Sequence, residues 1–171
     1  MRKRMIPLAL VAMLALAVGG YSIAGGGKKK VKADLSAYSE VPALSEPGIG
    51  SFKATIDDDT QTISYELTYA GLTSGPLFAH IHLGQKDVTG GVSAFLCGGS
   101  TKPACPPGPA TVTGTIMPVD IVGPTGQGIS AGEWAELVAA IRSGNAYANA
   151  HTALHPGGEI RGQINDEHGR D

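Results

Sequence analysis

Three of the five histidines have a spacing that could place them around one metal ion. His80 and His82 are separated by one residue, and side chains two apart in a β-strand lie on the same face. His151 ends the segment 147–151, in which polar residues alternate with alanines. If the two strands are neighbours, or face each other across a sandwich, the three imidazoles converge. Three imidazoles are typical of copper or zinc, with a fourth position open for water or another ligand.

The other two histidines are weaker candidates, and the whole set has a purely structural alternative. His155 lies in the loop His155-Pro156-Gly157-Gly158, from which it could supply a further ligand or simply face solvent. His168 belongs to a polar tail. A pair with the pattern His-x-His is common, so the strand histidines could instead bond to backbone or carboxylate groups in a polar patch.

The two cysteines, Cys97 and Cys105, flank a loop of Gly, Ser, Thr, Lys and Pro. In an oxidising compartment such a pair is expected to form a disulfide that staples the loop. A two-cysteine metal site is the alternative, although metal-binding pairs usually lie closer together in the sequence.

Polar residues on the last strand-like segment favour structure over catalysis. Glu159 and Arg161 lie on one face there, and Arg161 could pair with a carboxylate or bond to turn carbonyls. Asn149 shares a face with His151. Patterns typical of a serine nucleophile, a Walker loop or a Rossmann loop are absent from the sequence. We therefore expect Asn149, Glu159 and Arg161 to have structural roles, and no catalytic residue is assigned.

Short alternating segments must position these residues. The clearest is Thr62–Tyr69, and the acidic turn Asp57–Thr60 joins it to Gly50–Ile56 as a hairpin. One segment differs, because Ala131–Ser143 has the spacing of an amphipathic helix with Trp134 on its apolar side and Gly144 as its stop. The remaining predicted strands are Lys32–Tyr38, Phe78–Leu83, Gly91–Leu96, Ala110–Met117, Tyr147–Thr152 and Glu159–Ile164. Eight strands predict an all-β, antiparallel sandwich or barrel with one helix.

Composition sets the boundaries of this fold and excludes several classes. The 25 glycines and 11 prolines among 171 residues, with 16% charged residues, argue against coiled coils and disordered chains. A net charge of −2 gives no electrostatic case for binding nucleic acid.

The N-terminal part of the chain has the layout of an export signal. Basic residues 2–4 precede an uncharged run and the small residues Ser22 and Ala24, which predicts a signal peptide over residues 1–24. An uncleaved membrane anchor is the alternative. Residues 25–32 are expected to form a Lys/Gly-rich linker, 33–165 the domain and 166–171 a polar tail.

Several motifs together resemble the CHRD family, the domain named from chordin and common in exported bacterial proteins. The resemblance runs from about Ala33 to Ile164 and is carried by these motifs: Glu40-Val41-Pro42, Gly48, Gly50, Tyr65-Glu66-Leu67, Gly71-Leu72, Ala79-His80-Ile81-His82, Gly84, Gly91-Val92, Tyr147-x-Asn149-x-His151-Thr152 and His155–Ile164. It implies an immunoglobulin-like or related β-sandwich without an agreed activity, found in extracellular proteins.

The His-x-His strand is also similar to the metal-binding strand of the copper-zinc superoxide dismutases, which are Greek-key sandwiches. The bridging His and Asp of a two-metal site are not found, and the disulfide loop does not match.

Three functions follow from these resemblances and motifs. The first is a noncatalytic, secreted, periplasmic or cell-surface binding module that holds copper or zinc. The second is a copper-dependent redox enzyme of the dismutase type. The third is an adhesion or matrix domain that binds an extracellular protein or glycan and has structural histidines. A membrane association is expected only if the N-terminal segment stays uncleaved.

Overall fold

The computed structural model describes residues 27–99 and 101–167 of the chain. The predicted signal peptide, residues 1–24, and His168 lie outside the described residues. Within the described part, no helix is both long and apolar enough to cross a membrane.

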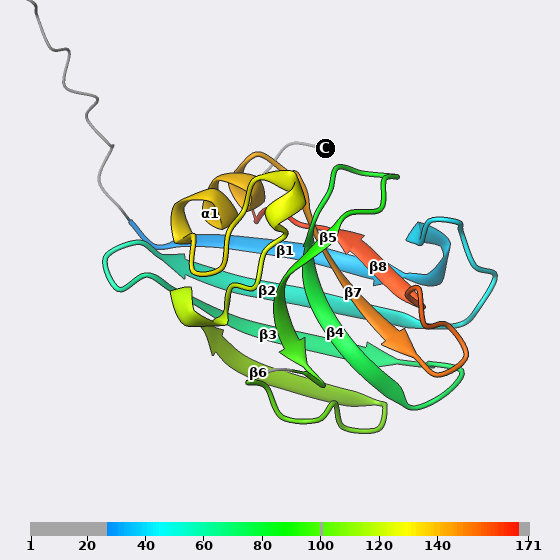
Figure 1. Cartoon of the computed structure of the whole chain (residues 1–171). Helices are drawn as coiled ribbons and strands as arrows, with labels where there is room; N and C mark the ends of the chain where they lie inside the picture. The colour runs from blue at the N-terminus through cyan, green and yellow to red at the C-terminus, as the bar shows by residue number, and fades with distance from the viewer. Residues whose placement is uncertain (1–26, 100, 168–171) are drawn as a thin grey trace, which may run out of the picture.

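The described residues form a mostly β structure with one α-helix (Figure 1). The strands are β1 (Lys29–Ser36), β2 (Ile49–Asp57), β3 (Thr62–Ala70), β4 (Pro76–Leu83), β5 (Gly91–Cys97), β6 (Ala110–Ile116), β7 (Ala146–Thr152), β8 (Ile160–Gln163) and β9 (Asn165–Asp166). The helix is α1 (Trp134–Arg142), and three short 3-10 turns lie at Ala37–Ser39, Pro118–Asp120 and Thr125–Gln127. All eight predicted strands are present, with ends that differ by a few residues.

The sheet extends beyond the predicted domain at both ends. β1 begins at Lys29, so the last four residues of the predicted linker belong to the sheet. The reason is that buried Val31, Ala33 and Leu35 alternate with polar residues there. At the other end Asp166 pairs with Val31, and its carboxylate lies 2.7 Å from the Lys29 ammonium. The predicted tail therefore begins with a residue of the sheet.

All strand pairs are antiparallel, and the strands make one continuous sheet rather than two separate ones. Its order is β5-β4-β7-β8-β1-β2-β3-β6, with β9 beside β1. The sheet curls so that β4, β5, β7 and β8 lie across from β1, β2, β3 and β6 (Figure 1). A bridge between Ala94 and Ile121 brings the chain after β6 against the β5 edge, which nearly closes a barrel. The predicted all-β, antiparallel fold with one short helix is confirmed.

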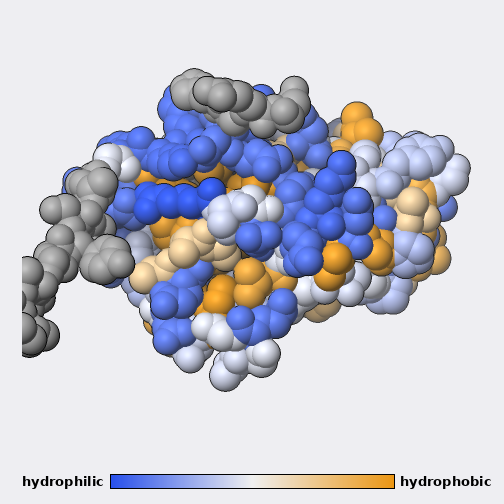
Figure 2. Space-filling model, turned by 90° about the horizontal axis from the view of Figure 1, so that it is seen from above, coloured by the Kyte–Doolittle hydropathy of each residue, from blue (hydrophilic) through white to orange (hydrophobic). Residues whose placement is uncertain are grey.

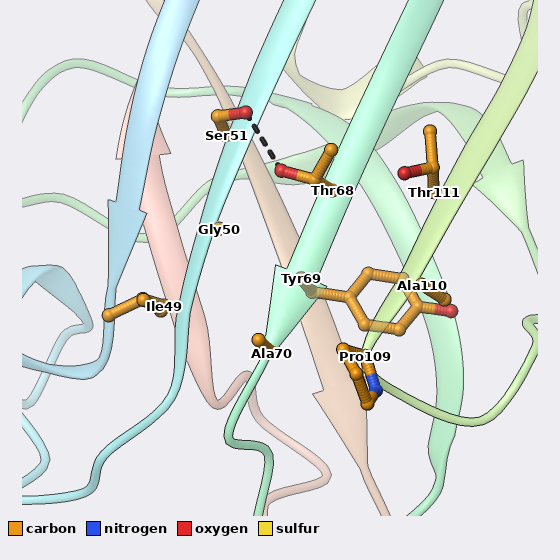
Figure 3. A pocket seen from close by; sticks show the side chains of 9 residues that line it. All are labelled: Ile49, Gly50, Ser51, Thr68, Tyr69, Ala70, Pro109, Ala110 and Thr111. Carbon is orange, nitrogen blue, oxygen red and sulfur yellow. Dashed lines mark hydrogen bonds between the residues drawn. The ribbon is translucent and has the colours of Figure 1, made fainter.

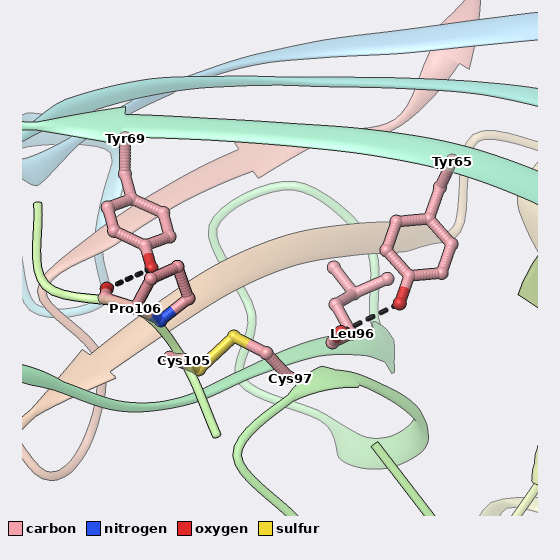
Figure 4. Close-up of a disulfide and its surroundings, with 6 residues drawn as sticks. All are labelled: Tyr65, Tyr69, Leu96, Cys97, Cys105 and Pro106. Carbon is pink, nitrogen blue, oxygen red and sulfur yellow. Dashed lines mark hydrogen bonds between the residues drawn. A yellow bond between two sulfur atoms is a disulfide. The ribbon is translucent and has the colours of Figure 1, made fainter. Parts of the chain in front are cut away.

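The core fills the space between these two halves. Phe52 and Leu67 face it from the first half, and the smaller Ala79, Ile81 and Ala148 face it from the second. The Tyr65 hydroxyl links β3 to β5 by donating to the Leu96 carbonyl, and the Tyr69 hydroxyl links β3 to the loop before β6 by donating to the Pro106 carbonyl (Figure 4).

The Cys97–Cys105 disulfide lies beside these links, as predicted (Figure 4). It ties the end of β5 to the loop that precedes β6.

Helix α1 is shorter than predicted but buries the predicted side chains. Trp134, Leu137, Val138 and Ile141 are all buried. The helix starts three residues later because Gly132, with a φ of +84°, turns the chain just before it. Of the expected capping box, the Ser130 N–H donates to the Glu133 carboxylate.

Candidate metal centre

The strand register places the three strand histidines on one patch of the outer face of the sheet. Neighbouring positions across β4, β7 and β8 are His80, Asn149 and Arg161 in one row. The flanking positions pair His82 with Tyr147 on one side, and Phe78 with His151 on the other. Alternation turns the residues between them toward the core: Ala79, Ile81, Ala148 and Ala150.

His80, His82 and His151 form a compact, buried cluster. One ring nitrogen from each lies within 4.8 Å of the others. The ring of His80 is centred 5.3 Å from that of His82 and 4.8 Å from that of His151. Their exposed fractions are only 6%, 6% and 8%. The expectation that the two strands are neighbours and bring the three histidines together is therefore correct, and the cluster is compatible with a metal ion.

Backbone carbonyls from two loops orient two of the imidazoles. Nδ1 of His82 lies 2.9 Å from the Gly90 carbonyl oxygen, and Nδ1 of His151 lies 3.0 Å from that of Pro156. Because a carbonyl oxygen only accepts hydrogen bonds, each Nδ1 carries the proton, and Nε2 of neutral His82 keeps its lone pair. This is the arrangement that usually orients histidine ligands in metal sites.

Several nitrogens of the cluster have no hydrogen-bond partner among the residues that the structure describes. Both ring nitrogens of His80 and Nε2 of His82 are buried, and the structure shows no hydrogen bond to any of these three atoms. An unsatisfied buried polar atom costs about 1–3 kcal/mol, and an ion bound by Nε2 of His82 and one nitrogen of His80 would remove the penalty of those two atoms. Unsatisfied nitrogens on two of three clustered imidazoles are the reason that this donor set fits a metal.

Burial keeps the cluster uncharged over the usual pH range. Desolvation, with smaller effects of the neighbouring histidines, lowers the pKa of His80 to about 3. Desolvation also lowers the pKa of His82 to about 4, against the hydrogen bond to Gly90, which raises it. The pKa of His151 is lowered by the same cause. Neutral imidazole is the form that binds metals, so no proton has to leave first.

Aromatic rings enclose the cluster. His80 is stacked on Phe78, with ring centres 5.8 Å apart, and meets the edge of Phe95 at 4.5 Å. Tyr147 stacks on His82 at 4.8 Å, with the two planes only 6° apart. The Arg161 guanidinium lies over the Tyr147 ring, 3.5 Å from its centre. These rings fix the imidazoles and shield them from water.

The predicted structural polar residues hold the loops around the site. Arg161 donates to the carbonyls of Gln85 and Val88, in the β4–β5 loop. Of the predicted alternatives, it therefore bonds to turn carbonyls. Glu159, fully buried, accepts hydrogen bonds from Thr73 and Thr152.

Asn149 belongs to the site itself. Its Oδ1 lies 2.9 Å from Nε2 of His151, and the residue is almost completely buried.

His155, proposed from the sequence as a fourth ligand, is not part of the cluster. Its Nε2 faces the Glu46 carboxylate at 3.7 Å. The loop turns at this residue, whose carbonyl accepts from the Thr152 and Gly158 N–H groups. What this loop contributes to the cluster is the Pro156 carbonyl, not the His155 side chain.

Glu40 is a site residue that sequence reasoning missed. It is 8% exposed, and its Oε1 has no hydrogen-bond partner. Burial raises its pKa to about 6, while the Val41 backbone, Arg161 and Asn149 lower it. Gly158, at a φ of +127°, packs so closely that a Cβ there would meet Glu40 Oε1 at 2.5 Å. The sequence marks Glu40 only as part of the CHRD-like motif, because its place comes from a loop.

A surface hollow lies elsewhere on the molecule. It has a volume of about 570 Å³ and is lined by parts of β2, β3 and the start of β6 (Figure 3). A smaller hollow of about 220 Å³ lies between Glu40 and the His155–Gly158 loop. The histidine cluster is thus a packed site and not an open cleft.

Comparison with known proteins agrees with the motifs. The family model of the CHRD domain matches residues 31–164, and the chain therefore belongs to the CHRD domain family. No curated protein and no solved structure matches the sequence.

Proposed function

We propose that this protein is a noncatalytic, extracytoplasmic binding module that holds one copper or zinc ion through His80, His82 and His151. The observation that carries the proposal is the convergence of three buried, neutral imidazoles, two of them with nitrogens that no protein group satisfies. Copper and zinc are the ions that imidazole ligands suit best.

The surroundings of the cluster favour metal binding rather than catalysis. The three ligands are nearly inaccessible, and the rings of Phe78, Phe95 and Tyr147 pack against them. A redox enzyme needs an open coordination position that substrate can reach. Dismutase-type catalysis is therefore the second candidate function. As a separate part of the proposal, the module binds an extracellular protein or glycan.

Export rests on two features. The Cys97–Cys105 disulfide is of the kind that persists in oxidising compartments. The predicted signal peptide over residues 1–24 would deliver the chain there.

Metal analysis of tag-free protein tests the proposal. We expect one equivalent of copper or zinc per chain after loading and desalting, and a loss of at least about 100-fold in affinity in His82→Ala, since one of three ligands is gone. The matched control is His155→Ala, which removes a histidine outside the cluster and should retain the metal. Substoichiometric metal in the wild type, unchanged by His82→Ala, would overturn the proposal.

A superoxide assay on the copper-loaded protein separates the two candidates. With a chelator present that removes unbound copper, we expect a rate no higher than that of the metal-free protein. Turnover that disappears in His82→Ala and persists in His155→Ala would instead establish the enzyme.

A further inference from the structure

The ligand cluster contains three neutral donors and no anion. Its members are His80, His82 and His151, without a carboxylate or thiolate. Sites for divalent ions commonly add an anionic ligand or water to complete four or more positions. Here His155, the predicted fourth ligand, faces Glu46 instead. An ion bound to this cluster would keep its whole charge in a buried place.

A buried cation lies close to the same ligands. Arg161 is 3% exposed, and its guanidinium, the Tyr147 ring and the His82 ring form one stack. Because like charges repel, the fixed guanidinium of this stack opposes added positive charge at His82. Glu40 is a buried carboxylate that interacts with Arg161 and Asn149, and it is not one of the three clustered ligands.

On these grounds we propose that the ion selected by His80, His82 and His151 is monovalent copper, Cu(I), rather than Cu(II) or Zn(II). The inference rests on the proposed metal-binding function and specifies its cargo. Donor type does not decide the matter, because imidazole binds zinc and copper alike. The charge of the ion and the number of ligands that it needs decide which ion binds.

The charge argument has a clear direction. The cost of moving an ion out of water grows with the square of its charge, so a divalent ion pays about four times as much as a monovalent one in the same buried site. Neutral ligands and a nearby guanidinium offset little of this desolvation free energy. Three nitrogens also suffice for Cu(I), whereas Zn(II) and Cu(II) favour four or more ligands.

Competition titrations on the full-length, metal-free protein test this selectivity. Cu(I) is titrated without oxygen against a chromogenic Cu(I) chelator, and Zn(II) and Cu(II) are titrated against chelators of known affinity. We expect one Cu(I) per chain, bound at least about 100-fold more tightly than either divalent ion.

Asn149→Asp is the most informative variant. It keeps the shape of the side chain but places a carboxylate oxygen where the amide oxygen lies 2.9 Å from Nε2 of His151, which adds an anion beside the cluster. We expect the affinity for Zn(II) relative to Cu(I) to rise at least about tenfold, because the divalent charge is then partly neutralised. Asn165→Asp makes the same chemical change at an exposed position and should leave the ratio unchanged.

A second variant covers the case in which Asn149→Asp does not fold. Arg161→Gln removes the buried cation and should shift the ratio in the same direction, while Arg161→Lys keeps the charge and should shift it less. Only the ratio is diagnostic, since a loosened structure would weaken all ions together.

The outcomes distinguish this inference from the function on which it rests. If Zn(II) or Cu(II) binds one per chain as tightly as Cu(I), the metal-binding function stands and the Cu(I) selectivity is wrong. An unchanged ratio in both variants also overturns the selectivity argument. If none of the three ions binds, the proposed function and this inference fail together.

Discussion

The outer faces of the two halves of the sheet have the same alternating pattern but different surroundings. On β2, β3 and β6 the outer residues form cross-strand rows, such as Ser51, Thr68 and Thr111, that face solvent (Figure 3). On β4, β7 and β8 the corresponding row is His80, Asn149 and Arg161, and all three are buried.

Loops make the difference between these faces. The β4–β5 loop and the His155–Gly158 loop bond to the second face through the carbonyls of Gly90 and Pro156. Seen from above, the surface of the molecule is largely hydrophilic, with hydrophobic residues interspersed (Figure 2). Polar residues on an uncovered sheet face form ordinary surface. Where loops cover the same alternating pattern, the polar residues are buried, their pKa values shift and some of their nitrogens have no hydrogen bond.

The largest expected effect of the difference between the two faces is on how the free energy of unfolding depends on pH. It is measured on protein from which a chelator has removed any metal. The pKa values of His80 and His82 fall from 6.5 to about 3 and 4, so between these values and 6.5 the unfolded chain binds more protons than the folded one. The free energy of unfolding should therefore fall as pH drops below 6.5, by about 1.4 kcal/mol per pH unit for each such histidine.

Glu40 acts in the opposite direction, because its pKa is raised from 4.5 to about 6. One carboxyl over that short range does not offset two or more histidines. Urea titrations at pH 7 and pH 5 measure the loss, and His80→Phe should reduce it. A stability that is flat or rises toward pH 5 would contradict the buried, neutral cluster.

The next largest effect is a difference in stability between alanine variants of two glutamates, one buried and one exposed. Glu159→Ala removes the acceptor of hydrogen bonds from Thr73 and Thr152 in a fully buried place, and should cost about 2–4 kcal/mol of unfolding free energy. Glu66→Ala, on the exposed face, should change it by less than about 0.5 kcal/mol. Chemical denaturation at pH 7 measures both. Equal effects would mean that the two halves do not differ as the burial indicates.

The smallest effect is expected on the open face itself. Thr113 is exposed on β6, opposite Glu66, and Thr113→Val should change stability by no more than about 0.5 kcal/mol. Thermal unfolding with a matched wild-type control measures it. A large destabilisation would show that this face is covered in solution, for instance by a partner.

The strand pattern was predictable because alternation is local. Residues Thr62–Tyr69 show it directly, and the same period of two put His80 and His82 on one face. The helix was found from its own period, but its start was placed too early, since nothing in the pattern shows the turn at Gly132. The disulfide followed from composition and compartment.

The positions that the sequence left open or did not show all involve loops. The sequence left His155 as either a further ligand or a surface residue of its loop, and the structure places its ring beside Glu46. Glu40 lies more than a hundred residues before Asn149, and no periodic signal connects a loop to the strand it covers.

The sequence by itself determined which residues share a face: His80 with His82, and Asn149 with His151, because side chains alternate along any strand. It also determined an all-β fold and a disulfide-bonded loop. Only the tertiary structure decided that β4 pairs with β7 in the register that joins the three imidazoles, and that two loops bury them. Register and loop placement depend on contacts between segments far apart in the chain, and such contacts leave no local pattern in the sequence.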